Sequence, residues 1–189
     1  MQERKSSIKD YSELNLTVKD NFLEKKFFKK LHKSIIFKNW NPIENYYVNT
    51  GKHIWFTCLV ENSLINYFKN EIEKKFNVKI KRLISDFAYT MVSNVKESSC
   101  HVDSSDAINN FGKDFNAQFI LYVNGNNELT NGTGFYTKGK NKEYHLTTHI
   151  GFVENRALLF KNNVMHSPLK FLSNDNKPRF SIICFLAIK

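Results

Sequence analysis

Apolar and polar residues follow two different periods along the chain, and the change from one to the other falls near residue 78. Before that point, two apolar stripes recur at helical spacing, three or four residues apart. The first predicts a helix from a cap at Asp20 or Asn21 to about Lys33, and the second predicts a helix capped by Asn62 or Ser63. The apolar positions of the two stripes are Phe22, Leu23, Phe27, Phe28 and Leu31, then Leu64, Phe68, Ile72 and Phe76.

From residue 78 onward, short runs of β-branched and aromatic residues alternate with Asn, Gly, Ser and Asp, which is typical of strands joined by turns. A short strand at 14–18 and a buried strand at 54–60 are predicted earlier in the chain, and the segment from Trp40 to about Gly51 is predicted to be a loop. The later strands are predicted near 78–84, 86–93, 98–103, 116–124, 133–138, 145–153, 156–161, 164–167 and 178–187.

Two helices followed by a long series of short strands predict an α+β fold, in which the helices pack against one sheet of a β-sandwich or jelly roll. A length of 189 residues suits a single domain with a sizeable core. We expect residues 1–77 to form a helix-rich support and residues 78–189 to form the jelly-roll core. The loop at 104–115 is long enough to act as a lid.

The composition favours a folded protein in a reducing compartment. Hydrophobic residues make up 41% of the chain and aromatic residues 14%, which is ample for a packed interior. The three cysteines form no Cys-x-x-Cys pair, and no apolar run reaches the roughly 18 residues that span a membrane. The N-terminus also lacks the apolar centre of a secretory signal, so we expect a cytoplasmic protein with no membrane partner.

The net charge of +10 raises the question of nucleic-acid binding. Lysine pairs such as Lys25-Lys26 and Lys74-Lys75 fall on the polar faces of the predicted helices, where solvated charge is the ordinary finding. A general excess of Lys, Asn, Ile and Phe over Gly, Ala and Val is also what an AT-rich coding sequence produces. Nucleic acid is therefore a weaker alternative among the partners.

Three residues that are far apart in the sequence suggest a metal site. Side chains two apart on a strand project from the same face, so His101 and Asp103 are expected to point into one cavity. His166, on a later strand, can supply a second imidazole from across that cavity. Two histidines and one carboxylate form a facial set that holds Fe(II) and leaves coordination positions open.

The last strand begins with a cation. Arg179 opens an otherwise apolar run, and Ser181 shares its face. A buried guanidinium needs an anion to offset its desolvation, and a carboxylate bound through two hydrogen bonds is the natural partner. A strand-end arginine that reaches solvent is the alternative. On the strand at 116–124, Gln118 and Tyr122 are expected to share one face with Ile120.

These motifs follow an order that resembles the Fe(II)/2-oxoglutarate-dependent oxygenases, and most of all their prolyl-hydroxylase branch. The order is His-x-Asp, a strand ending in Tyr-x-Asn, a Gly-containing turn, a Leu-Leu-Phe strand, His, and Arg-x-Ser, over roughly residues 86–187. The resemblance implies a double-stranded β-helix (jelly-roll or cupin-like) fold with the N-terminal helices on one sheet. It implies Fe(II) ligation by His101, Asp103 and His166, and binding of the 2-oxoglutarate cosubstrate by Arg179, with hydrogen bonds from Ser181 and Tyr122. The third open metal position would take O2.

The implied reaction is hydroxylation of a protein side chain or of a small amino-acid-like molecule. Asp103 favours hydroxylation, because halogenating relatives lack this carboxylate. Two departures concern the loops. The turn reads Gly132-Thr133-Gly134-Phe135 where many relatives have Gly-Gly-x-Leu, and the interval from His166 to Arg179 is a few residues longer than usual.

Other functions remain open at this stage. A non-catalytic jelly-roll binding module could keep the cavity without turnover. A nucleic-acid-modifying oxygenase is suggested only by the charge, and its relatives carry a second arginine where this chain has Phe185. A zinc hydrolase would leave Arg179 unexplained.

His145 and His149 are four apart, but their Thr-rich context favours a strand over a metal-binding helix. Candidate residues for the mouth of the cavity are Trp40, Tyr46, Tyr47, Phe111 and Phe115.

Overall fold

A computed structural model describes residues 15–43, 55–84, 87–92, 100–103, 115–125, 130–139, 143–169 and 178–189. The helices are α1 (Lys25–Ser34), the 3-10 turn η2 (Ile35–Phe37) and α2 (Asn62–Phe76). The strands are β1 (Thr17–Lys19), β2 (Asn41–Ile43), β3 (Trp55–Leu59), β4 (Ile80–Leu83), β5 (Ala88–Val92), β6 (Ala117–Asn124), β7 (Gly132–Lys138), β8 (Tyr144–Gly151), β9 (Ala157–Lys161), β10 (Met165–Pro168) and β11 (Arg179–Ile188).

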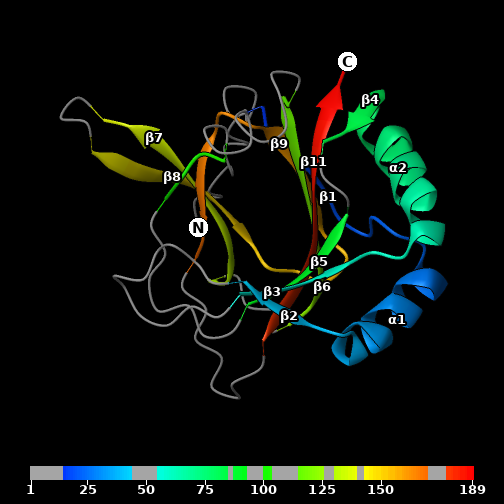
Figure 1. Cartoon of the computed structure of the whole chain (residues 1–189). Coiled ribbons are helices and arrows are strands. Elements are labelled where there is room, and N and C mark those ends of the chain that lie inside the picture. Colours follow the sequence, from blue (N-terminus) through cyan, green and yellow to red (C-terminus); the bar gives the residue numbers. More distant parts are fainter. Residues whose placement is uncertain are drawn as a thin grey trace, which may run out of the picture.

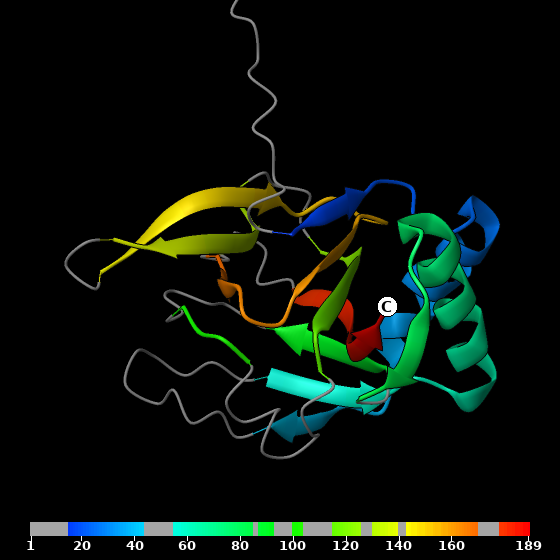
Figure 2. The ribbon, with the colours of Figure 1, turned by 90° about the horizontal axis from the view of Figure 1, so that it is seen from above.

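The strands form two antiparallel sheets. The larger has eight strands in the order β1-β9-β6-β11-β5-β3-β2, with β4 also paired to β11, and the smaller has the order β10-β7-β8. Both helices lie on the outer face of the large sheet, while the β7–β8 hairpin extends away from the helices (Figure 1). The view from above separates the small sheet from the helix layer (Figure 2). This arrangement confirms the predicted jelly roll with helices on one sheet.

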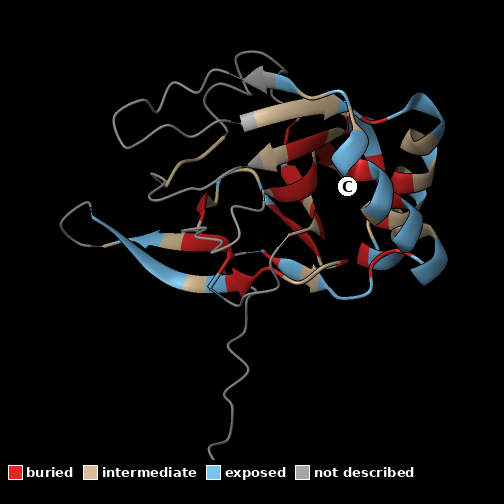
Figure 3. Ribbon diagram, turned by 90° about the horizontal axis from the view of Figure 1, so that it is seen from below, coloured by how far each residue is buried: buried red, intermediate tan, exposed pale blue. Residues whose placement is uncertain are grey.

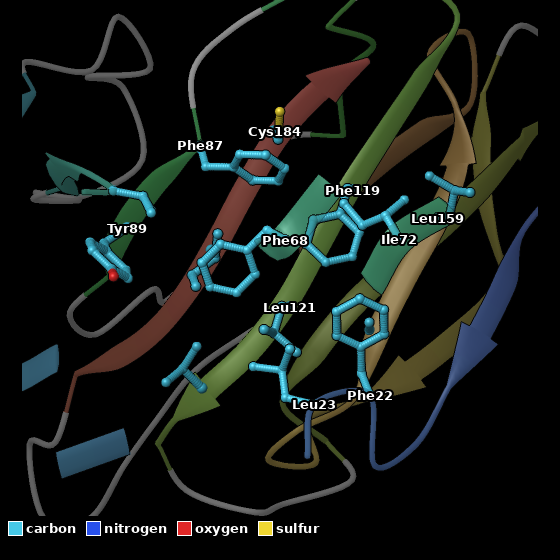
Figure 4. Packing of buried hydrophobic residues seen from close by; sticks show 14 of the residues in the cluster. Phe22, Leu23, Phe68, Ile72, Phe87, Tyr89, Phe119, Leu121, Leu159 and Cys184 are labelled. Atoms are coloured by element: carbon cyan, nitrogen blue, oxygen red, sulfur yellow. The ribbon is translucent and has the colours of Figure 1, made fainter. Parts of the chain in front are cut away.

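Strict alternation along the two central strands separates the core from the interior of the jelly roll. On β11, Phe180, Ile182 and Cys184 point toward the helices, and on β6 the same is true of Phe119 and Leu121. Figure 4 shows Phe68 and Ile72 of α2 beside Phe119 and Leu121 of β6, in the same cluster of buried residues. The intervening residues face the space between the sheets, and those that line its cavity are Gln118, Ile120, Arg179, Ser181, Ile183 and Phe185. The predicted shared faces are therefore confirmed.

The first helix begins later than predicted. The segment before α1 is occupied by tertiary contacts, because Asp20 pairs with Arg156 and the side chain of Asn155 exchanges hydrogen bonds with the backbone of Leu23. These contacts hold the segment out of helical geometry, so the helix starts at Lys25, with no side-chain cap. The second helix starts slightly earlier than predicted, because Glu61 and not Asn62 or Ser63 is the residue before its first turn. It ends at Phe76 and is followed by Asn77, which adopts a left-handed conformation with φ 54°.

One segment predicted as a loop contains a strand. Residues 41–43 form β2, which pairs with β3 at the end of the large sheet. Pro42 has no amide hydrogen to donate, and an edge strand tolerates this. The first 77 residues, expected to form a helix-rich support, also contribute the strands β1, β2 and β3 to the large sheet.

Burial follows the layers, with buried positions concentrated between the sheets and under the helices (Figure 3). The predicted lid at 104–115 lies outside the described residues except for Phe115. In the part of the chain that the structure describes, neither helix is long and apolar enough to cross a membrane.

Candidate active site

The two site histidines face each other across a backbone pair. His101 forms an isolated antiparallel bridge with His166 of β10, and each donates its backbone N–H to the carbonyl of the other at 2.9 Å. Directly opposed residues project to the same side of a sheet, so the two rings lie 4.8 Å apart between centroids. Asp103 follows two residues later, and its Oδ1 lies 3.4 Å from Nε2 of His101.

The ring of His166 is fixed from behind. Its Nδ1–H donates to the carbonyl of Val164 at 3.0 Å, so Nε2 is the ring nitrogen that faces the cluster and that could bind a metal. Phe160 packs edge-on at 5.0 Å between ring centroids, and the whole side chain is buried. Nε2 points toward the carboxylate of Asp103, whose Oδ2 lies 3.5 Å away.

Asp103 carries the negative charge of the cluster. Burial alone would raise the pKa of its carboxyl, but hydrogen bonds and charge interactions with His101 and His166 outweigh burial and hold the pKa well below its ordinary value. Oδ2 also accepts a hydrogen bond from Nε2 of Gln118 at 2.6 Å. The sequence placed Gln118 on the correct face but gave no signal for this contact, which depends on how the chain at 101–103 packs across β6.

The structure therefore brings the three predicted ligands together. Their ligand atoms all lie within 4.8 Å of one another, and no other group of this kind is found within the described residues. Two imidazole nitrogens and one carboxylate oxygen fit a divalent first-row metal such as Fe(II) and leave room for exogenous ligands.

A cavity of about 140 Å³ extends from the three ligands toward Arg179. Arg179 is buried at 6% exposure, and its Nη1 donates to the carbonyl of Gly132 at 2.8 Å. Its Nε has no hydrogen-bond partner among the described residues. Burial lowers the pKa of this guanidinium. No carboxylate of the described residues lies at ion-pair distance, so a buried donor is left for an anionic ligand.

The hydroxyl groups beside Arg179 differ in their access to the cavity. Ser181 and Thr90 line it, and Thr133 lines it as well. Tyr122 lies behind this wall, with its ring stacked on Phe152 at 4.7 Å and its hydroxyl bonded to Oγ1 of Thr133 at 2.7 Å. Burial raises the pKa of Tyr122. Thr133 stands where the Gly-Gly-x-Leu pattern has its second glycine, so the unusual turn places a hydroxyl between Tyr122 and the cavity.

Several other candidates have ordinary structural roles. His145 and His149 are exposed on β8, which confirms the strand predicted from their Thr-rich context. Trp40 packs on Phe180 beside the helix-side core and not at the mouth. Phe115 is buried and packs on Phe185, which lines the cavity. The remaining mouth candidates, Tyr46, Tyr47 and Phe111, lie outside the described residues.

Comparison with known proteins identifies the fold. No protein-family model matches the sequence, and no curated protein matches it significantly. Among solved structures, a prolyl-4-hydroxylase of Pseudomonas putida is similar over 94% of this chain and 95% of its own, with a TM-score of 0.56 at 12% identity. A prolyl hydroxylase of Trichoplax adhaerens, solved with a hypoxia-inducible-factor peptide fragment, gives a TM-score of 0.63 at 12% identity, covering 94% and 85% of the two chains.

The chain has the fold of the 2-oxoglutarate/Fe(II) oxygenases. HygX of Streptomyces hygroscopicus, solved with nickel, 2-oxoglutarate and hygromycin B bound, is also similar over 94% of this chain and 84% of its own, with a TM-score of 0.59 at 8% identity. The double-stranded β-helix predicted from the motif order is confirmed at the level of the fold.

Proposed function

We propose that this protein is an Fe(II)- and 2-oxoglutarate-dependent dioxygenase that hydroxylates a protein side chain or a small amino-acid-like substrate. The observation that carries the proposal is the convergence of His101, Asp103 and His166 in a cavity that also contains a buried arginine with an unused donor. The three ligands and Arg179 would bind the two parts of one Fe(II)/2-oxoglutarate complex. A metal satisfies the ligands, and a dicarboxylate reaches from the metal to Arg179.

The residues of this chain have separate tasks in the proposed reaction. His101, Asp103 and His166 hold the metal on one face and leave the opposite face open. Arg179, with Ser181 beside it, holds the remote carboxylate of 2-oxoglutarate and so orients its other end toward the metal. When bound, Fe(II) supplies the chemistry by which 2-oxoglutarate and O2 give succinate, CO2 and a hydroxylated C–H bond.

The cavity wall favours this chemistry by excluding water. Ile120, Ile183 and Phe185 form an apolar part of the wall of the cavity that also contains the three ligands and Arg179. Charged groups in such a setting interact more strongly than in water. The apolar Phe185 occupies the position where nucleic-acid-dealkylating relatives carry a second arginine, which supports a substrate other than nucleic acid.

The substrate class rests on similarity of the fold. One neighbour is solved with a peptide fragment and another with the small molecule hygromycin B. Either class is compatible with a cavity whose inner part is filled by the cosubstrate. Screening peptides and free amino acids for substrate-stimulated succinate formation separates the two.

The decisive test combines spectroscopy and turnover. We expect anaerobic addition of Fe(II) and 2-oxoglutarate to produce the weak visible charge-transfer band of the chelate, and succinate to form slowly once air is admitted. Folded protein that gives no band, or a band with no succinate under any substrate condition, would instead favour a non-catalytic binding module. Salt-dependent binding of DNA or RNA would favour a nucleic-acid substrate.

A further inference from the structure

The metal ligands differ in how firmly the backbone holds them. His166 lies within β10, which pairs with β7, and its ring is fixed by Val164 and Phe160. Asp103 lies in a turn that follows a single bridge residue, outside any strand. A ligand at such a position can rotate about its own side-chain bonds unless another group restrains it. Among the three ligands, the carboxylate therefore has the greatest need of side-chain support.

Gln118 provides that support. It lies on β6, directly across from Phe160 of β9 and Phe185 of β11, so both of its cross-strand neighbours are aromatic residues. The side chain is buried at 2% exposure. A buried amide costs free energy unless its polar atoms are hydrogen-bonded. Here the amide donates its N–H to Oδ2 of Asp103 at 2.6 Å, a charge-assisted contact.

This contact constrains the orientation of the carboxylate. With Oδ2 held by Gln118, Oδ1 faces Nε2 of His101 at 3.4 Å and Oδ2 faces Nε2 of His166 at 3.5 Å. The carboxylate plane is thereby turned toward both ring nitrogens at once. Because a carboxylate only accepts hydrogen bonds, the donor must be the nitrogen of the amide, which fixes the amide orientation as well.

We infer that Gln118 is a positioning residue that orients Asp103 for metal binding. This inference rests on the proposed metal site and assigns Gln118 no contact with the substrate or with the carboxylate bound at Arg179. Groups that hold a metal ligand from outside the coordination sphere change metal affinity by about 10- to 100-fold when removed. Gln118 lies near the metal ligands and pairs with Phe185 of β11, whereas Arg179 lies at the opposite end of β11. Substitution of Gln118 should therefore change the affinity for the metal more than the affinity for 2-oxoglutarate.

The test measures metal affinity directly, without turnover. Gln118→Met keeps an unbranched side chain of similar length but removes the donor. We expect its Mn(II) dissociation constant, from the electron paramagnetic resonance signal of free Mn(II), to rise by about 10- to 100-fold. The visible spectrum of bound Co(II) should change, because the carboxylate is no longer held in one orientation. At saturating Mn(II), the 2-oxoglutarate dissociation constant should stay within about threefold of that of the unmodified protein.

A matched variant separates positioning from loss of stability. Asn116→Ala removes two hydrogen bonds to Ile188 next to the start of the same strand, with no contact to Asp103, and should leave Mn(II) affinity within about twofold. If Gln118→Met does not fold, Gln118→Asn can replace it. The asparagine side chain is too short to reach Asp103, so the same rise in the Mn(II) dissociation constant is expected.

Two results would overturn the inference while leaving the proposed function intact. The first is Mn(II) binding by Gln118→Met within twofold of the unmodified protein. The second is an equal loss of affinity in Asn116→Ala. Failure of the unmodified protein to bind Mn(II) at all would overturn both the inference and the proposed function.

Discussion

Arg179→Met should affect ligand binding and folding stability in opposite directions. The guanidinium is buried, its Nε finds no hydrogen-bond partner in the part of the chain that the structure describes, and burial lowers its pKa. In the ligand-free protein this charge is therefore a cost to the fold, offset in part by one hydrogen bond to the carbonyl of Gly132. Methionine has comparable reach and no charge, so it removes both the desolvation cost and the anion-binding group.

The magnitudes follow from these contacts. Loss of the Gly132 hydrogen bond costs about 1 kcal/mol, and relief from burying an uncompensated charge is worth at least as much. The free energy of unfolding without ligand should thus stay unchanged or rise. Loss of a buried, charge-assisted carboxylate contact costs about 2–4 kcal/mol, which raises the 2-oxoglutarate dissociation constant about 30- to 700-fold.

The assay is thermal unfolding with Mn(II), measured with and without 2-oxoglutarate. At about 100 times its dissociation constant, a ligand stabilises the native state by about 2.7 kcal/mol. The unmodified protein should show this increase in Tm, and Arg179→Met should lose most of it. The control is Arg156→Met, which removes an arginine paired with Asp20 and should keep the full ligand-dependent increase. The reasoning is refuted if Arg179→Met is strongly destabilised without ligand, or if its 2-oxoglutarate affinity is unchanged.

Three further variants test other parts of the account. His166→Ala should abolish Mn(II) binding in a calorimetric titration while the circular dichroism spectrum stays native; retained binding would place the metal elsewhere. Arg156 lowers the pKa of Asp20 below its ordinary value of 3.8, so this pair stabilises the fold above about pH 4 and the contribution is lost in more acidic solution. Because Asp20 is half exposed, Asp20→Asn should cost at most about 1 kcal/mol in urea unfolding at pH 7, and this cost should shrink as the solution becomes more acidic. A cost that does not change with pH would contradict the pairing. Gly132 has φ +139°, and an added Cβ would lie 2.0 Å from the carbonyl oxygen of Ile150. Gly132→Ala should therefore destabilise the fold by about 2–3 kcal/mol. An unchanged thermal unfolding curve would show that the turn adapts to the added Cβ.

The central strands were predictable because their pattern is set by burial on both faces. β6 and β11 alternate between large apolar residues that meet the helices and residues that face the cavity, and this period of two is visible in the sequence. The same pattern placed Arg179 and Ser181 on the cavity side. The cluster of His101, Asp103 and His166 could be predicted because the order of motifs along the chain resembles that of the oxygenases.

The rest depends on contacts between segments that are distant in the sequence. The start of α1 is displaced by Asn155, which lies 132 residues after Leu23, and no local signal at the helix end reveals this. The bond from Tyr122 to Thr133 joins residues on β6 and β7, two strands of different sheets, and it was not expected. Gln118 was placed on the correct face, but its partner could be found only once the turn carrying Asp103 was positioned in space.

The central claim is that one cavity holds a metal at one end and a carboxylate at the other. A crystal structure grown anaerobically with Mn(II) and 2-oxoglutarate tests it most directly. We expect an anomalous peak about 2.0–2.2 Å from Nε2 of His101, Nε2 of His166 and one oxygen of Asp103, with the remote carboxylate hydrogen-bonded to Arg179. Metal bound at any other residues, or 2-oxoglutarate absent from the Arg179 end of the cavity, would contradict the account.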